Sequence, residues 1–220
     1  MKPHRSDQEE PAARSAGAPT AAKSSDSTNM NGSLPGALEP RSANAHADIR
    51  VLYCPGAGAD PHGARYQALV TAGYDVFAPD YRGLDVATAA DILMYQILDK
   101  PTHTQILVGH SFGGAAALLA ALAAAKNGVT VLGLVLCAPA IFVAQAVMAP
   151  SRLPSPPAPS ILIHGLHDDV IPIELSRGFA REHDLPFLEV SDDHALLRSL
   201  DTMTEAVATI GSATGGNPRV

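Results

Sequence analysis

Residues 105–114 read Gln-Ile-Leu-Val-Gly-His-Ser-Phe-Gly-Gly, and this stretch decides the fold. Its apolar residues 106–108 predict a short buried strand. Residues 115–126 are almost all Ala and Leu, and they predict a helix that is apolar nearly all round and therefore buried against a sheet. Strand and helix are joined by a tight turn centred on Ser111.

The turn has the pattern Gly-x-Ser-x-Gly, which is typical of a nucleophile elbow. In such an elbow Ser111 lies on a strained turn, so that its hydroxyl stands clear at the carboxyl end of the strand. Gly109 and Gly113 leave room where strand and helix pass too close for side chains, and the helix N-terminus directs N–H groups at an oxyanion. An ordinary β-to-α turn is the alternative interpretation, but the strand before it and the helix after it favour a nucleophile.

Length and charge limit the classes of function. The chain has 220 residues, 46% of them hydrophobic, which is enough for one α/β domain with a buried core. The formal net charge is −7, and the first 47 residues hold five basic and five acidic groups, so the whole excess belongs to the remainder. An acidic domain without a Lys/Arg cluster argues against a nucleic-acid partner, and solubility accounts for the acidity.

Cysteine usage and hydropathy bear on the compartment. Cys54 and Cys137 are the only cysteines, and both lie near the ends of apolar strands, where Cys acts as a small hydrophobe and no disulfide is expected. No segment reaches ~18 uninterrupted apolar residues, and the N-terminus lacks the apolar core of a signal peptide. We therefore expect a cytoplasmic protein without a membrane span.

Three segments differ in composition. Residues 1–47 are an Ala/Pro/Ser-rich tail predicted to be disordered, residues 48–211 hold the predicted domain, and residues 212–220 a flexible tail. The predicted strands are 49–54, 74–81, 105–110, 131–139, 161–165 and 186–190. The predicted helices are 64–72, 84–98, 115–126, 141–148, 173–183 and 195–210. This alternation predicts a doubly wound, mainly parallel α/β sheet of about six strands with helices on both faces.

A serine hydroxyl needs a base, and the base needs an orienting acid, so partners of Ser111 are expected in loops that follow other strands. The loop after strand 161–165 offers Asp168 and Asp169, and the loop after the last strand offers His194. Each of these residues also has a non-catalytic interpretation. A carboxylate before a helix often only caps that helix, and a single histidine usually has a structural role. The three residues together, each after a strand, favour a catalytic triad.

With these residues, stretch 49–210 resembles the α/β-hydrolase family, most closely its small lidless esterase- or thioesterase-like members. The elbow, the terminal histidine, and the chain order Ser, Asp, His match the family. Loop 165–172 is similar to the family's G-x-x-D-x-x-V-P acid loop, and that register selects Asp168 over Asp169.

The resemblance implies a role for each site residue. Ser111 is the expected nucleophile, His194 the base and Asp168 the orienting acid. The glycine-rich loop after the first strand stands where the family has its oxyanion loop, which implies that the backbone N–H groups of Ala57 and Phe112 form the oxyanion hole.

The sequence departs from the family at three points. The family's first two strands are missing before residue 49, and the segment that builds a lid is reduced to the Pro-rich stretch 149–160. Pro55 replaces the His that is common before the oxyanion glycine. The short connection implies an open site and argues against interfacially activated lipase action.

These observations predict a serine hydrolase that cleaves carboxylic ester bonds of small substrates through an acyl-enzyme, with no metal or organic cofactor. A thioesterase acting on acyl-CoA or an acyl carrier uses the same triad and is the alternative. A non-catalytic binding protein that retains the fold is a second alternative. A nucleotide site at the loop 56–58 is a third, although the loop lacks the Gly-Lys-Ser/Thr ending of a phosphate loop.

Overall fold

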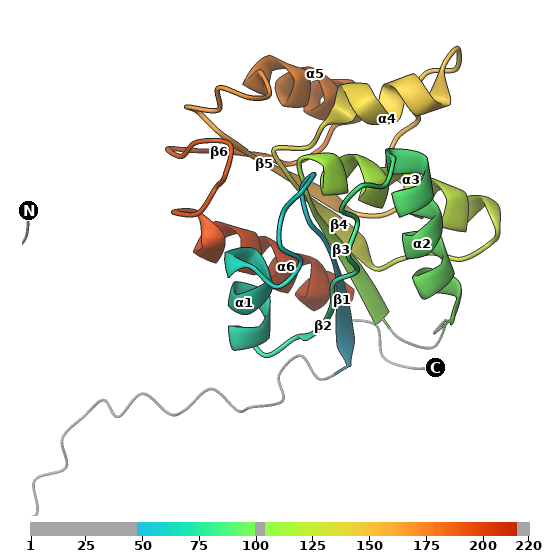
Figure 1. Cartoon of the computed structure of the whole chain (residues 1–220), viewed down its shortest axis with the longest axis horizontal. Coiled ribbons are helices and arrows are strands. Elements are labelled where there is room, and N and C mark those ends of the chain that lie inside the picture. The colour runs from blue at the N-terminus through green and yellow to red at the C-terminus, as the bar shows by residue number, and fades with distance from the viewer. Residues whose placement is uncertain (1–47, 100–103, 215–220) are drawn as a thin grey trace, which may run out of the picture. The chain divides into compact units, whose positions relative to one another are not determined.

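A computed structural model describes residues 48–99 and 104–214, so the tail predicted over residues 1–47 lies outside the described residues. Over these residues six strands form one sheet, and every neighbouring pair is parallel. The strands are β1 (Ile49–Cys54), β2 (Asp75–Phe77), β3 (Thr104–His110), β4 (Gly133–Cys137), β5 (Ser160–Gly165) and β6 (Phe187–Val190). Their order across the sheet is β2-β1-β3-β4-β5-β6 (Figure 1). The predicted parallel α/β architecture is confirmed.

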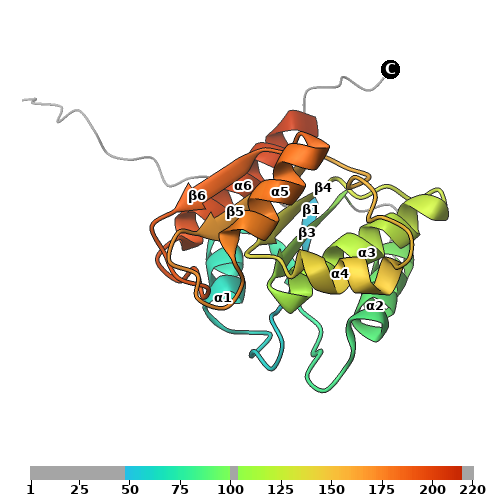
Figure 2. The same cartoon turned by 90° about the horizontal axis from the view of Figure 1, so that it is seen from above.

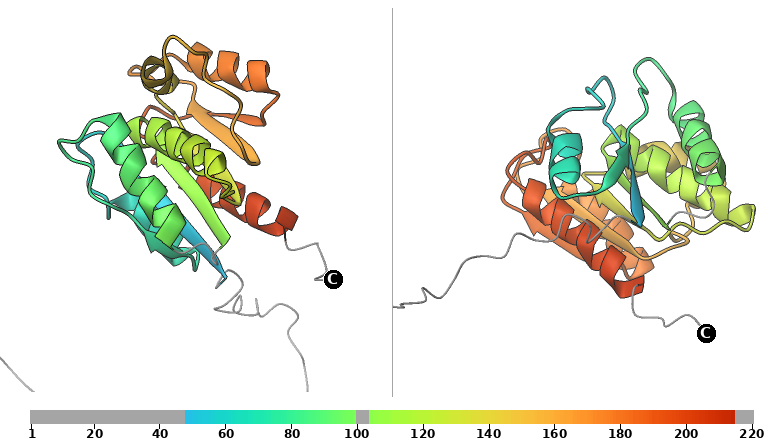
Figure 3. Two further views of the ribbon diagram at one scale, coloured as in Figure 1. Left: turned by 90° about the vertical axis from the view of Figure 1, so that its right-hand side faces the viewer. Right: turned by 90° about the horizontal axis from the view of Figure 1, so that it is seen from below.

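Helices cover both faces of this sheet. They are α1 (Ala64–Thr71), α2 (Val86–Asp99), α3 (Phe112–Lys126), α4 (Ile141–Met148), α5 (Ile173–His183) and α6 (Leu200–Thr214). The helices α1 and α6 pack together on one face, while α2, α3, α4 and α5 lie in sequence across the other (Figures 2 and 3). Each face therefore has its own hydrophobic core.

Side chains of the central strands alternate between the two cores. The core under α2 to α5 receives leucines, namely Leu52, Leu107, Leu134, Leu136 and Leu162. The core under α1 and α6 receives β-branched residues, namely Val51, Ile106, Val108, Val135 and Ile163. Because α3 is rich in alanine and presents little side-chain volume, the longer leucines fill the space between it and the sheet.

The helix α3 lies deep against the sheet, as its apolar sequence predicts, with most of its residues buried. This close packing requires glycine at two positions. A Cβ on Gly113 would overlap the carbonyl group of Cys54 in β1, and a Cβ on Gly109 would overlap the α3 backbone at Gly113 and Gly114. The glycines of the elbow therefore serve the contact between strand and helix.

The last helix begins later than the sequence pattern predicts. Residues 195–199 form a loop, and α6 begins at Leu200. The nearly fully buried carboxylate of Asp192 accepts hydrogen bonds from the Arg198 N–H (2.8 Å) and the Ser199 hydroxyl (2.9 Å), and it holds these residues outside the helix. At its other end α6 continues to Thr214, into the segment 212–220 that was expected to be a tail.

Cys54 and Cys137 are buried and free, one in each core, as expected for small apolar residues. None of the helices in the described ranges is both long enough and apolar enough to cross a membrane.

The glycine contact generates the first prediction. We expect Gly113→Ala to lower the free energy of unfolding by about 3 kcal/mol or more, because overpacking against backbone cannot be relieved by a side-chain movement. Gly178→Ala is the matched control, since Gly178 lies inside α5 with open space where its Cβ would stand. It should stabilise the protein by up to about 1 kcal/mol. Urea unfolding followed by circular dichroism measures both, and equal stability of the two variants would contradict the packing argument.

Candidate active site

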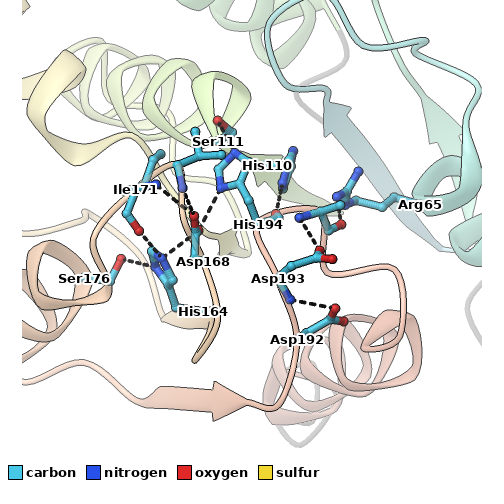
Figure 4. Close-up of polar contacts among 12 residues, drawn as sticks. Arg65, His110, Ser111, His164, Asp168, Ile171, Ser176, Asp192, Asp193 and His194 are labelled. Carbon is cyan, nitrogen blue, oxygen red and sulfur yellow. Dashed lines mark hydrogen bonds and ion pairs between the residues drawn. The ribbon is translucent and has the colours of Figure 1, made fainter.

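The carboxyl ends of three strands bring Ser111, Asp168 and His194 together (Figure 4). Ser111 follows β3 directly, while Asp168 and His194 lie in the loops after β5 and β6. Because all strands of a parallel sheet end at one edge, residues far apart along the chain meet there.

Ser111 has an unusual backbone conformation, with φ +54° and ψ −118°. Residues other than glycine rarely adopt such angles, which cost on the order of 1–3 kcal/mol. The neighbouring strand holds the residue in place, because the Ser111 N–H donates to the Cys137 carbonyl at 2.9 Å. The Ser111 carbonyl in turn accepts from the Ala140 N–H at 3.0 Å, which fixes the start of α4 beside the elbow.

The side chains of the three residues form one continuous hydrogen-bonded chain. His194 Nε2 lies 3.0 Å from Ser111 Oγ, and His194 Nδ1 lies 2.7 Å from Asp168 Oδ2. An ionised carboxylate only accepts hydrogen bonds, so Nδ1 carries the proton and donates it to Asp168. Because Nδ1 is the donor to Asp168, Nε2 is the ring nitrogen that faces the Ser111 hydroxyl, which is the arrangement of a general base.

The Asp168 side chain is wholly buried and fully hydrogen-bonded. Its Oδ1 accepts from the backbone N–H groups of Val170 (2.9 Å) and Ile171 (2.8 Å). Burial acts to raise the pKa of this carboxyl, but the hydrogen bonds from Ile171, His194 and Val170 outweigh it and hold the pKa below its ordinary value. Asp169 is exposed, so of the two candidate carboxylates only Asp168 faces His194.

The two expected oxyanion donors are Phe112, directly after Ser111, and Ala57, in the loop after β1. Phe112 is the first residue of α3, so its N–H is one of those that a helix leaves without an intrahelical partner. Ala57 lies exposed in the turn closed by the bond from the Ala59 N–H to the Gly56 carbonyl (3.1 Å), and its own N–H is not used by that bond. A Cβ on Gly56 would stand 3.6 Å from the Ser111 Cβ, which puts this loop against Ser111.

Two residues with no assigned role in the sequence analysis hold the main chain of the histidine loop. His110 Nε2 lies 2.8 Å from the His194 carbonyl, and the Arg65 guanidinium donates to the Ala195 carbonyl (Figure 4). Both carbonyls only accept, so His110 carries its proton on Nε2. Arg65 comes from α1, and no local sequence signal points to its contact with a loop 130 residues away.

The His110 side chain is buried, with its Nδ1 atom against Gly56. Among the described residues, this Nδ1 atom has no hydrogen-bond partner. Burial, together with the nearby Arg65 charge, lowers the pKa of His110 to about 3. His110 is therefore neutral at physiological pH, where it acts as a donor to the histidine loop.

Protonation of buried histidines should make the fold sensitive to acid. Burial also lowers the pKa of His164, which lies under Asp168. Between pH 6.5 and 4.5 the unfolded chain binds a proton at His110 that the native state does not bind, so stability falls as pH falls. The lowered pKa of His164 acts in the same direction. The slope is at most about 1.4 kcal/mol per pH unit for each histidine. Below that window Asp168 and Asp192, whose pKa values are lowered, add a further loss of stability.

The variant His110→Gln tests this pH dependence. Glutamine keeps an N–H donor for the His194 carbonyl but does not titrate, so the slope between pH 6.5 and 4.5 should decrease by up to about 1.4 kcal/mol per pH unit. Urea unfolding at a series of pH values measures the slope. An unchanged slope would mean that His110 binds its proton as easily in the native state as in the unfolded chain.

Histidines and carboxylates gather at the carboxyl ends of the strands, but among the described residues they do not form a metal site. Within residues 48–99 and 104–214, no group of three or more His, Cys, Asp or Glu side chains could hold a metal ion.

Comparison with known proteins bears on the family. Residues 51–217 match the model of the alpha/beta hydrolase family. Comparison with curated proteins found no match. Among solved structures, the chain is similar to Est1E from Butyrivibrio proteoclasticus, with 16% identity, a TM-score of 0.60, and coverage of 74% of this chain and 88% of that one.

Two thioesterase structures are similar as well. One is YbtT, a type II thioesterase of the yersiniabactin NRPS/PKS pathway (14% identity, TM-score 0.58, 77% of this chain and 95% of that one). The other is BorB, the type II thioesterase of the borrelidin cluster (18% identity, TM-score 0.57, 74% and 90%). At these low sequence identities, the likeness to solved structures shows only a shared fold. Membership of a family is shown by the family model, which matches most of the chain. The chain belongs to the alpha/beta hydrolase family.

Proposed function

We propose that this protein is a serine hydrolase that cleaves carboxylic ester bonds of small substrates. The observation that carries the proposal is the unbroken hydrogen-bonded chain from Ser111 through His194 to Asp168, with distances of 3.0 and 2.7 Å. Such a chain gives a serine hydroxyl the base that it needs to attack a carbonyl carbon.

The proposed reaction begins when Ser111 Oγ attacks the ester carbonyl and His194 Nε2 takes the hydroxyl proton. Asp168, held anionic by the hydrogen bonds from Val170, Ile171 and His194, stabilises the imidazolium that forms. The N–H groups of Ala57 and Phe112 bind the oxyanion of the tetrahedral intermediate. His194 then gives its proton to the leaving alcohol, which leaves an acyl group on Ser111. Water, activated by His194 in the same way, releases the acid and restores the enzyme.

An ester is preferred over an acyl-CoA because of the charges beside the triad. Asp169 and Asp193 are exposed, and each is the immediate neighbour of a triad residue. Two carboxylates at this place oppose a leaving group that carries several phosphate charges. The thioesterase alternative draws on the likeness in fold to two type II thioesterases, and a thioester with an uncharged leaving group remains compatible with the same site.

The nucleophile assignment is tested with Ser111→Ala. We expect kcat for p-nitrophenyl esters to fall by about 1,000-fold or more, because the attacking atom is removed. A fluorophosphonate probe should label the wild type and not this variant. Ser212→Ala is the control, since Ser212 lies exposed on α6 and should be labelled and active like the wild type. No turnover and no labelling of folded wild type would instead support a non-catalytic binding protein.

Pairs of substrates that share one acyl group test whether the two carboxylates oppose an anionic leaving group. We expect kcat/KM for an ester with an anionic leaving group to increase with ionic strength, whereas kcat/KM for its neutral counterpart stays nearly constant. At low salt, Asp169→Asn should raise kcat/KM for the anionic ester about twofold, as expected for the loss of one charge that acts on the leaving group through water. Asp184→Asn is the matched control, because Asp184 is exposed at the end of α5, shortly before the start of β6. The site lies at the other end of the strands, where they finish. A preference for the anionic ester would overturn the argument.

A further inference from the structure

His164 is a buried histidine that the proposed mechanism does not use. It is the penultimate residue of β5, four residues before Asp168, and its side chain is completely inaccessible to solvent. Burying an imidazole without partners is unfavourable, so each of its contacts has to be accounted for.

The contacts of His164 define its protonation. Its Nε2 atom lies 2.9 Å from Asp168 Oδ2 and 3.0 Å from the Ile171 carbonyl oxygen (Figure 4). Both oxygens only accept hydrogen bonds, so Nε2 carries a proton and shares it between them. The Asp168 oxygen that it contacts is the same one that accepts from His194 Nδ1.

The opposite side of the ring is held by α5. His164 Nδ1 lies 2.8 Å from the hydroxyl of Ser176, which is also completely buried. Burial lowers the pKa of His164 more than the Ile171 carbonyl and Asp168 raise it, so the ring is neutral and Nδ1 has no proton. The Ser176 hydroxyl therefore donates to Nδ1, which fixes the tautomer that keeps a proton on Nε2.

We propose that His164, oriented by Ser176, is a positioning residue that holds Asp168 Oδ2 in line with His194. This inference rests on the proposed serine-hydrolase function, because it extends the hydrogen-bonded chain of Ser111, His194 and Asp168 by two residues. The backbone N–H groups of Val170 and Ile171 fix the other carboxylate oxygen. His164 supplies a fixed donor to Oδ2, so the carboxylate stays in place while His194 gains and loses its second proton.

A positioning role predicts a particular kinetic result. His164 lies behind Asp168 and is buried, so its loss should lower kcat while KM changes little. A residue that served only to join β5 to α5 would lower the melting temperature without changing the kcat of the folded enzyme.

Two polar substitutions separate the two contacts of the ring. The amide of asparagine ends near the position of Nδ1, so His164→Asn keeps a partner for Ser176 and loses the donor to Asp168. The amide of glutamine reaches the position of Nε2, so His164→Gln keeps the donor to Asp168. We expect kcat to fall about 10-fold in His164→Asn and less than about threefold in His164→Gln, as for loss and retention of one hydrogen bond to a charged group.

Leu93→Ala is the control for lost stability, because Leu93 is fully buried in the core under α2 to α5, and α2 carries none of the residues of the polar chain. It should lower the melting temperature while leaving the kcat of the folded enzyme within about twofold of the wild type. Equal kcat in His164→Asn and wild type, or equal losses in His164→Asn and His164→Gln, would overturn the proposal.

A second measurement needs no substrate. In proton NMR spectra the N–H of a His–Asp pair gives a downfield resonance, which can be assigned by its absence in His194→Gln. The resonance should be sharp in the wild type and in His164→Gln, and lost or broadened in His164→Asn. An unchanged resonance in His164→Asn would overturn the proposal.

If the NMR result holds while the wild type hydrolyses no ester, the proposed function fails and the positioning role stands. If Ser111-dependent turnover is present and His164→Asn keeps full kcat, only the positioning role fails.

Discussion

The close contact of α3 with β1 and β3 is the constraint on which the rest of the structure depends. At Gly109 and Gly113 there are no Cβ atoms to collide with the α3 backbone or with the Cys54 carbonyl, so the helix begins directly after the strand. This abrupt change of direction requires the positive φ of Ser111. The apolar burial of α3 is large, and it offsets the cost of keeping one residue strained. The packing of the core and the exposure of the candidate nucleophile thus have one cause.

A second constraint is polar and concerns Asp168. A buried carboxylate without donors is costly, and here the loop after β5 is shaped around it, with two backbone N–H groups at one oxygen and two imidazoles at the other. The same carboxylate therefore fixes the positions of His194 and His164. The histidine loop is held independently by His110 and Arg65, so His194 is positioned through both its ring and its main chain.

Local patterns in the sequence were sufficient for the architecture and for part of the candidate site. Apolar runs predict the strands, and Gly-x-Ser-x-Gly predicts the turn at Ser111, because both depend on neighbouring residues. The bends in the loops depend on distant partners and could not be predicted. Asp192 keeps residues before Leu200 out of a helix through hydrogen bonds to its side chain. Helix propensities of the individual residues do not take such bonds into account. Arg65 meets a carbonyl 130 residues away, and its position in α1 gives no indication of that contact.

The stability of the fold itself bears on the choice between a hydrolase and a binding protein that merely retains the fold. Asp168, His164 and His110 occupy buried positions where apolar residues of similar size would be as stable or more stable. His110 even leaves Nδ1 without a hydrogen-bond partner in the described part of the chain. Together with the strained Ser111, these three buried polar side chains lie around one hydroxyl group, whereas other buried polar side chains, such as Arg50 and Gln105, lie elsewhere in the sheet. Strained backbone and perturbed titratable groups concentrate at sites that carry out chemistry. Their concentration around Ser111 therefore favours a hydrolase, because a binding surface needs none of them.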